Sequence, residues 1–164
     1  MAEFTLKPNV VVLGERNYEA ALDLVMAKAD RELLVFDQHL RTGAYNTVKR
    51  YDILRAFLNK NTNNRIQMVL HEATFLQNQC PKLLDLLKTY GHVMQVLLTN
   101  DFAKIAKDCF VIADNKYTVR RIHIDHARFK YTLDDAETAA SLRLRFDELV
   151  AETTEPVAIS KLGL

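Results

Sequence analysis

Several imidazole and guanidinium side chains follow apolar runs of the sequence, at positions where α/β proteins commonly bind their ligands. The candidates are His39, Arg41, His71, Arg121, His123 and His126. Imidazoles and the forked donors of arginine are suited to hold a phosphate or a carboxylate. If the six side chains converge on one deep pocket, we expect a site for a small anionic ligand. If they are scattered over a shallow surface, the sequence favours an interaction module, or simply the polar residues that are usual at strand ends.

Metal and cofactor chemistry have little support. The segment His123-Ile124-Asp125-His126 is the only cluster with metal-like composition, but on a strand His126 would point away from His123 and Asp125, and no partner motif accompanies it. The four glycines are isolated, so the sequence has no glycine-rich phosphate loop, and no Gly-x-Ser-x-Gly pattern supports a serine hydrolase. We therefore expect neither a bound metal nor a cofactor.

A basic stripe on two later strands is the feature that could favour nucleic acid. Single-stranded nucleic acid is bound by basic residues interleaved with aromatic rings. The residues concerned are Arg120, Arg121, Arg128 and Lys130, beside Tyr117 and Tyr131. The formal net charge is only +1, however, and the last helix is acidic. We expect a solvated strand face and no nucleic-acid partner.

The stretch from Asp108 to Asp125 is expected to position the last of the candidate side chains. Cys109–Ala113 is an unbroken apolar run, typical of a strand buried on both faces. Asp114 and Asn115 tolerate positive φ and predict a turn. The chain resumes as a strand over residues 117–124, on which Arg121 and His123 share one face.

Apolar spacing predicts the other elements. Helices are expected over residues 18–26, 48–58, 81–91 and 135–150, and strands over residues 33–36, 66–70, 93–98 and 129–133. Asn17 and Asp134 are the expected caps of the first and last helices. Alternating helices and strands argue for parallel pairing in the first half, and three successive strands argue for a mixed second half. The predicted fold class is α/β, with a mixed, mainly parallel sheet and helices on both faces.

One domain accounts for the whole chain. Its 164 residues, 49% of them hydrophobic, are typical of an ordinary globular protein. We expect residues 1–16 to form an N-terminal arm or added strand, residues 17–150 the α/β domain, and residues 151–164 a tail without periodicity. No apolar run approaches the roughly 20 residues of a membrane span, and the first residues lack a signal-peptide pattern. We expect a cytoplasmic protein with reduced cysteines.

The order of these elements over about residues 17–150 resembles one phospholipase D-like domain. In that family an apolar strand carries His-x-Lys-x4-Asp, further strands follow, and a helix ends the domain. Matching Asp114 to the family's aspartate places Cys109 at the lysine position and Lys107 at the histidine position. The Gly-Ser-x-Asn element that usually follows is missing, and residues 120–123 occupy roughly that region.

The resemblance implies a fold whose chemistry has been lost in this chain. Relatives hydrolyse phosphodiesters through a phosphohistidine, which requires an imidazole that is nucleophilic and neutral near pH 7. Neither Lys107 nor a cysteine in an apolar run replaces that group. We therefore expect a non-catalytic binding or interaction module. The resemblance also implies a homodimer, because catalytic relatives place two motif strands face to face and this chain has length for one. Phe110 and Ile112 would then need cover from a second copy.

Two alternatives stay open at this point. One is a hydrolase or transferase that acts on a phosphoryl or carboxyl compound through His39, His71 or His123. The other is a flavodoxin-like nucleotide-binding or regulatory domain, which the alternation of helices and strands in the first half would also permit.

Overall fold

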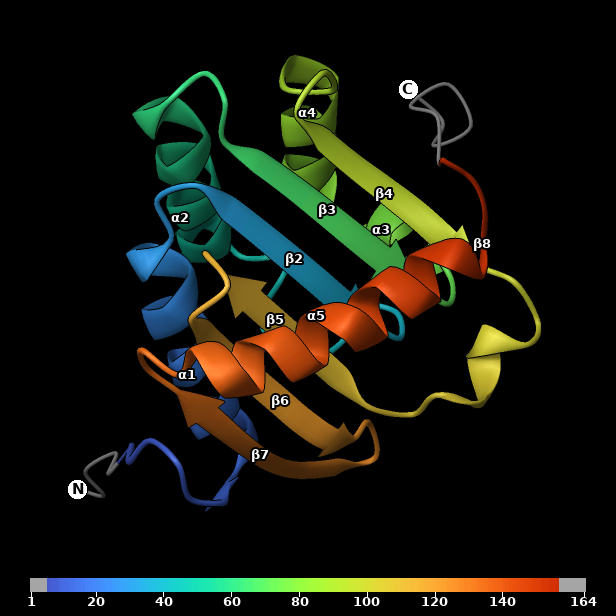
Figure 1. Cartoon of the computed structure of the whole chain (residues 1–164). Coiled ribbons are helices and arrows are strands. Elements are labelled where there is room, and N and C mark those ends of the chain that lie inside the picture. The colour runs from blue at the N-terminus through green and yellow to red at the C-terminus, as the bar shows by residue number, and fades with distance from the viewer. Residues whose placement is uncertain (1–5, 157–164) are drawn as a thin grey trace.

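Strand β5 (Cys109–Ala113) lies inside an eight-stranded mixed sheet with the order β1-β7-β6-β5-β2-β3-β4-β8. The computed structural model describes residues 6–156 (Figure 1). The other strands are β1 (Val12–Leu13), β2 (Glu32–Asp37), β3 (Arg65–Leu70), β4 (Met94–Thr99), β6 (Tyr117–His123), β7 (His126–Thr132) and β8 (Thr153–Pro156). The helices are α1 (Glu15–Lys28), α2 (Val48–Lys60), α3 (Thr74–Gln79), α4 (Pro81–Thr89) and α5 (Ala136–Ala151), with a 3-10 turn η1 (Ala103–Ile105). The predicted α/β class with a mixed sheet is confirmed.

The parallel part of the sheet is smaller than predicted. Among the described strands, β2–β3 and β3–β4 are parallel pairs, whereas the other five pairings are antiparallel. Helical connections return the chain so that β3 and β4 run with β2, but the tight turns after β5 and β6 reverse it. The prediction of a mainly parallel sheet is therefore wrong outside β2–β4. A flavodoxin-like domain requires a parallel sheet, so that alternative is also wrong.

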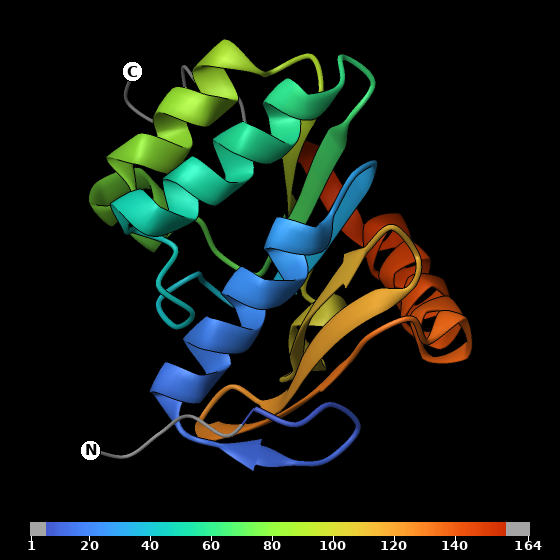
Figure 2. The ribbon, with the colours of Figure 1, turned by 90° about the vertical axis from the view of Figure 1, so that its left-hand side faces the viewer.

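Helices cover both faces of the sheet, as predicted. Figure 2 shows α1, α2 and α4 on one side of the strands and α5 on the other. Alternate residues of β5 serve the two layers: Val111 belongs to the larger core beside α1, while Phe110 and Ile112 belong to the smaller core beneath α5. The rings of Phe110 and Phe146 of α5 lie 6.4 Å apart between centroids. The run that organises the sheet is thus buried on both faces within a single chain.

Both ends of the described chain add edge strands. Val12 of the expected arm pairs antiparallel with Phe129 of β7, so the arm contains a short strand. Part of the expected tail forms β8, where Thr153 lies opposite Thr99 of β4. The four residues of β8, Thr-Thr-Glu-Pro, show no apolar–polar alternation from which a strand could be predicted. Residues 1–5 and 157–164 of these two segments lie outside the described residues.

Two helix starts differ from the predictions. Helix α1 begins at Glu15, so Asn17 lies in its first turn and does not cap it. Helix α5 is capped by Asp135, whose Oδ1 accepts a hydrogen bond from the Thr138 backbone N–H at 3.0 Å. Asp134 has φ 52° and lies outside the helix. None of the helices within residues 6–156 is long and apolar enough to cross a bilayer.

Candidate functional site

The carboxyl ends of β2, β3 and β4 meet the start of β5 at one edge of the sheet. Parallel neighbours end together, and β5 runs antiparallel to β2 with Phe110 opposite Phe36. This register brings Asp37, the last residue of β2, beside Cys109, the first residue of β5. Open α/β sheets bind ligands at such an edge. The same edge contains Cys109, which the phospholipase D resemblance aligns with the lysine of the motif.

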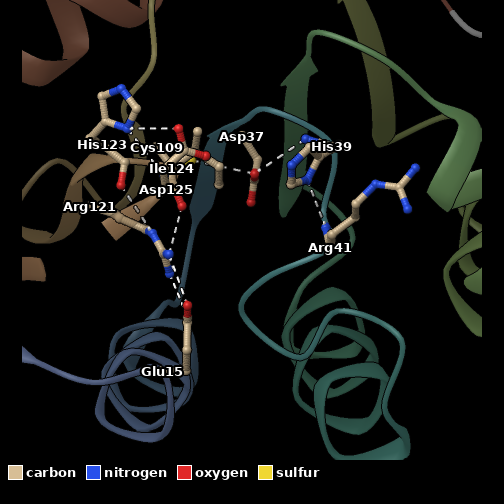
Figure 3. A network of polar contacts seen from close by, with 9 residues as sticks. All are labelled: Glu15, Asp37, His39, Arg41, Cys109, Arg121, His123, Ile124 and Asp125. Atoms are coloured by element: carbon tan, nitrogen blue, oxygen red, sulfur yellow. Dashed lines mark hydrogen bonds and ion pairs between the residues drawn. The ribbon is translucent and has the colours of Figure 1, made fainter. Parts of the chain in front are cut away.

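A buried carboxylate and a buried thiol occupy the centre of this edge (Figure 3). Asp37 is 1% exposed, and its Oδ1 accepts hydrogen bonds from the backbone N–H of Gln38 at 2.6 Å and from Cys109 Sγ at 3.5 Å. Asp37 Oδ2 and the Tyr45 hydroxyl are buried and have no hydrogen-bond partner. Burial raises the pKa of Asp37, and burial together with the nearby Asp37 raises the pKa of Cys109. The centre of this edge therefore consists of a carboxyl group and a thiol that are both shielded from solvent.

We expect the titration of Asp37 to change the free energy of unfolding with pH. A raised pKa in the folded state means that the folded protein holds this proton more tightly than the unfolded chain does. The stability that Asp37 contributes is therefore greatest at pH values below the ordinary aspartate pKa. It is lost as the pH rises through the raised pKa that Asp37 has in the folded protein. Asp37→Asn removes the titration, so we expect the stability of the variant relative to the wild type to rise between pH 4 and pH 7. Urea unfolding across this range measures the change.

The fully exposed Asp101 supplies the matched control, because Asp101→Asn removes a carboxylate without altering a buried group. An equal stability difference between Asp37→Asn and the wild type at both pH values would contradict a titrating buried carboxylate at position 37.

Arg121 is buried near the same region, and four of its five N–H donors are hydrogen-bonded within the protein. Its Nη1 and Nη2 donate to Glu15 Oε1 at 2.6 Å and Oε2 at 3.0 Å, and Nη2 also donates to the Ile124 carbonyl oxygen at 2.7 Å. Its Nε donates to the His123 carbonyl oxygen at 3.4 Å, and its guanidinium lies over the Tyr18 ring. These contacts join α1 to β6, and Arg121 is 1% exposed. We conclude that Arg121 stabilises the fold here.

His71 is also saturated by contacts within the protein. Its Nε2 lies 2.8 Å from the Ala106 carbonyl oxygen and its Nδ1 lies 2.7 Å from Thr99 Oγ1. Because a carbonyl only accepts, Nε2 carries the proton and Nδ1 accepts from the threonine hydroxyl. Burial lowers the pKa of His71, which favours this neutral form. Gln38 Nε2 donates to the same Ala106 oxygen at 3.0 Å.

The remaining candidates lie on two separate parts of the surface. His39 Nδ1 accepts from the Arg41 backbone N–H at 3.1 Å, and the half-exposed Arg41 forms an ion pair with Glu72 at 3.5 Å. The rings of His123 and His126 lie 5.5 Å apart between centroids at the turn between β6 and β7. Figure 3 shows His39 and His123 on opposite sides of Asp37. The six predicted residues thus do not surround one pocket.

The three motif positions are equally dispersed. Lys107 is exposed, and only its backbone oxygen is engaged, by the Ile124 N–H at 2.8 Å. Cys109 is buried beside Asp37, while Asp114 lies at the opposite end of β5 and binds the backbone of residues 30–32. Within residues 6–156, no three His, Cys, Asp or Glu side chains are grouped to hold a metal ion.

Sequence reasoning missed the acidic residues that organise this region. Asp37 follows a buried strand, which was its only signal, and Glu15 offered none. Asp108 is 4% exposed and accepts from Arg120 Nε at 3.1 Å and Arg145 Nη2 at 2.5 Å. Each of these acids depends on a partner that is distant in the sequence or on the pairing of β2 with β5.

Comparison with solved structures places this fold among known ones. A phospholipase D family member, Nuc from Salmonella typhimurium, superposes with a TM-score of 0.64 at 11% sequence identity, over 88% of this chain and 96% of Nuc. TrmBL2, an archaeal chromatin protein described with a novel mode of DNA binding, gives a TM-score of 0.66 at 15% identity, over 92% of this chain but 55% of TrmBL2. Phosphatidylserine synthase from Haemophilus influenzae Rd KW20 gives 0.60 at 9% identity, over 94% of this chain and 40% of the synthase.

These likenesses establish a phospholipase D-like fold and, at such low identities, the fold alone. No curated protein matches the sequence. A family model described as "Domain of unknown function (DUF7931)" matches residues 15–158, which includes every helix and nearly every strand described above. The chain therefore belongs to the DUF7931 family, and its fold is that of a phospholipase D-like domain.

Proposed function

We propose that this chain is a non-catalytic phospholipase D-like domain that acts as an interaction module. The observation that carries the proposal is the contact between Cys109 and Asp37 at the position of the motif lysine. A phosphate held there would meet a buried carboxylate where the family uses an ammonium group, and like charges in a buried site repel strongly. The Cys109 thiol cannot replace the ammonium group, because it carries no positive charge. Its raised pKa also opposes formation of a thiolate nucleophile.

The strand-end histidines support an enzyme less well than an interaction module. A general base needs a free nitrogen within reach of its substrate, and both nitrogens of His71 are already hydrogen-bonded. His39 and His123 accept backbone hydrogen bonds from Arg41 and Asp125 through Nδ1. Their separation across Asp37 also argues against joint action on one substrate (Figure 3).

We expect no turnover of a chromogenic phosphodiester above the uncatalysed rate. The reason is the absence of an imidazole at the motif position, where Lys107 is exposed and Cys109 is buried. The assay compares the wild type with His39→Ala, His71→Ala and His123→Ala. Turnover that one of these substitutions abolishes would restore the enzyme alternative.

The dispersal of the six candidate residues also favours a protein or surface partner over a small anion. Arg121, the best phosphate donor of the set, is buried and directs four of its five N–H donors at Glu15 and two carbonyl oxygens. TrmBL2 binds DNA according to its description, but Arg120 of the basic stripe forms an ion pair with Asp108. We keep the expectation that this chain has no nucleic-acid partner, which fluorescence anisotropy with labelled DNA would test.

The homodimer stays a prediction, but the packing reason for it is wrong. Phe110 and Ile112 are each 1% exposed and lie beneath α5, so β5 needs no cover from a second copy. A dimer must therefore use another surface. Sedimentation velocity at micromolar concentration measures the state, and a single species of 18.8 kDa would count against the dimer.

A further inference from the structure

The loop between β4 and β5 presents the two most exposed large apolar side chains in the described part of the molecule. Phe102 is 81% exposed and Ile105 is 84% exposed. Figure 1 shows this yellow segment standing out from the body of the domain beyond the strand ends. It belongs to the same edge as Asp37 but plays no part in the contacts of the buried centre.

The loop has a threefold pattern that follows from its 3-10 geometry. Residues three apart lie on the same side of such a turn, so Phe102 and Ile105 project together. Ala103, on another side, is buried against the core beneath α5. Lys104 lies within the turn and Lys107 two residues after it, and both side chains are exposed. The turn is therefore amphipathic in cross-section.

Hydrogen bonds hold the base of this loop in place. The Ala106 carbonyl oxygen accepts from Gln38 Nε2 and His71 Nε2, and the Asn100 side chain accepts from the Ala103 backbone N–H at 3.2 Å. Asn100 Nδ2 in turn donates to Glu152 at 2.8 Å. The apolar tip is thus presented in a fixed conformation, and docking it requires little ordering of the loop.

The charge around the tip favours a negative surface. Lys104 forms a 3.6 Å ion pair with Asp101, whereas Lys107 has no ion pair within residues 6–156. Because Asp101 offsets one of the two lysines, the tip carries a formal charge of +1. A narrow convex tip is too small for a stable protein interface, which buries about 800 Å² per partner. A fluid lipid surface can close around two side chains, and anionic headgroups attract adjacent lysines.

We infer that the loop of residues 101–107 docks on anionic lipid surfaces, by inserting Phe102 and Ile105 while Lys104 and Lys107 contact the headgroups. This inference rests on the proposed role as an interaction module and names what that module meets. A second copy of the chain is a less favourable partner for the tip. A symmetric contact would bring the lysines of both copies together, and their like charges would repel.

The chain contains no tryptophan, so Phe102→Trp introduces a single fluorophore at the tip. With vesicles of equal parts phosphatidylcholine and phosphatidylglycerol, we expect its emission to shift to the blue and to be quenched by brominated lipid. Leu144→Trp, at a 67% exposed position on α5, is the matched control and should not respond. Absence of the shift at position 102, or the same shift at position 144, would overturn the inference.

Vesicle co-sedimentation separates the contributions of the apolar and basic side chains. Phe102→Ser with Ile105→Ser should weaken binding at least about tenfold, and Lys104→Gln with Lys107→Gln should remove a preference of about tenfold for anionic over neutral vesicles. Equal binding by the wild type and the serine variant would refute the docking role. The docking role would also be refuted if the wild type formed a dimer without vesicles and the two serine substitutions dissociated that dimer without changing the urea midpoint of unfolding. If the protein neither binds vesicles nor hydrolyses phosphodiesters, the lipid-docking inference is wrong while the proposal of a non-catalytic domain still holds.

Discussion

Replacing Arg121 with alanine is expected to destabilise the protein by about 3 kcal/mol, the middle of the range for truncating a large buried side chain. The substitution leaves a cavity above the Tyr18 ring and removes the donors to Glu15 and to the carbonyl oxygens of His123 and Ile124. Glu15 is half-exposed, so water can solvate its released carboxylate and the ion pair itself contributes modestly. Most of the loss should come from packing and from the carbonyl groups. Urea unfolding at neutral pH measures it.

Two further variants separate these contributions. Arg121→Met keeps most of the packing but loses every hydrogen bond, so its cost should be smaller than that of Arg121→Ala. Glu15→Gln keeps one acceptor and should cost about 1 kcal/mol or less. If Glu15→Gln proved as damaging as Arg121→Ala, the ion pair rather than burial would dominate, and our account of Arg121 would be wrong.

Arg121 also shows how far the sequence predicts the site. Alternation along β6 predicts Arg121 and His123 on one face, but the pairing of β6 with β7 shifts register between these two residues. Whether Arg121 had free donors depended on Glu15, 106 positions earlier in the chain. Such a long-range pair leaves no local pattern, so an arginine that binds phosphate and one that joins α1 to β6 look alike in the sequence.

The strand β5 and the turn after it were predictable for the opposite reason. An unbroken apolar run indicates burial on both faces, and all five residues of β5 are buried. Asp114 and Asn115 have φ of 55° and 58°, the positive values that their residue types predict. The burial of Asp37, by contrast, follows from the register between β2 and β5, which no short segment encodes.

Asp114 is the residue that the resemblance aligns with the motif aspartate, and its contacts within the protein give it a structural role. Its carboxylate accepts hydrogen bonds from the backbone N–H groups of Asp30 at 2.8 Å, Arg31 at 2.8 Å and Glu32 at 3.0 Å. In return, its own N–H donates to the Glu32 carbonyl oxygen at 3.0 Å. These bonds hold the start of β2 against the end of β5. The pairing fixes the register that brings Asp37 to Cys109.

Asp114→Ala should therefore cost about 2–3 kcal/mol, because three backbone donors lose a charged acceptor and alanine is strained at positive φ. Asp114→Gly relieves the strain but not the lost bonds, and should recover about 1 kcal/mol of that loss. Asp114→Asn tolerates the same φ and keeps one acceptor, so it should be the least damaging of the three. Urea unfolding gives the ranking. If alanine were as stable as the wild type, Asp114 would not hold the start of β2, and our structural account of this residue would be wrong.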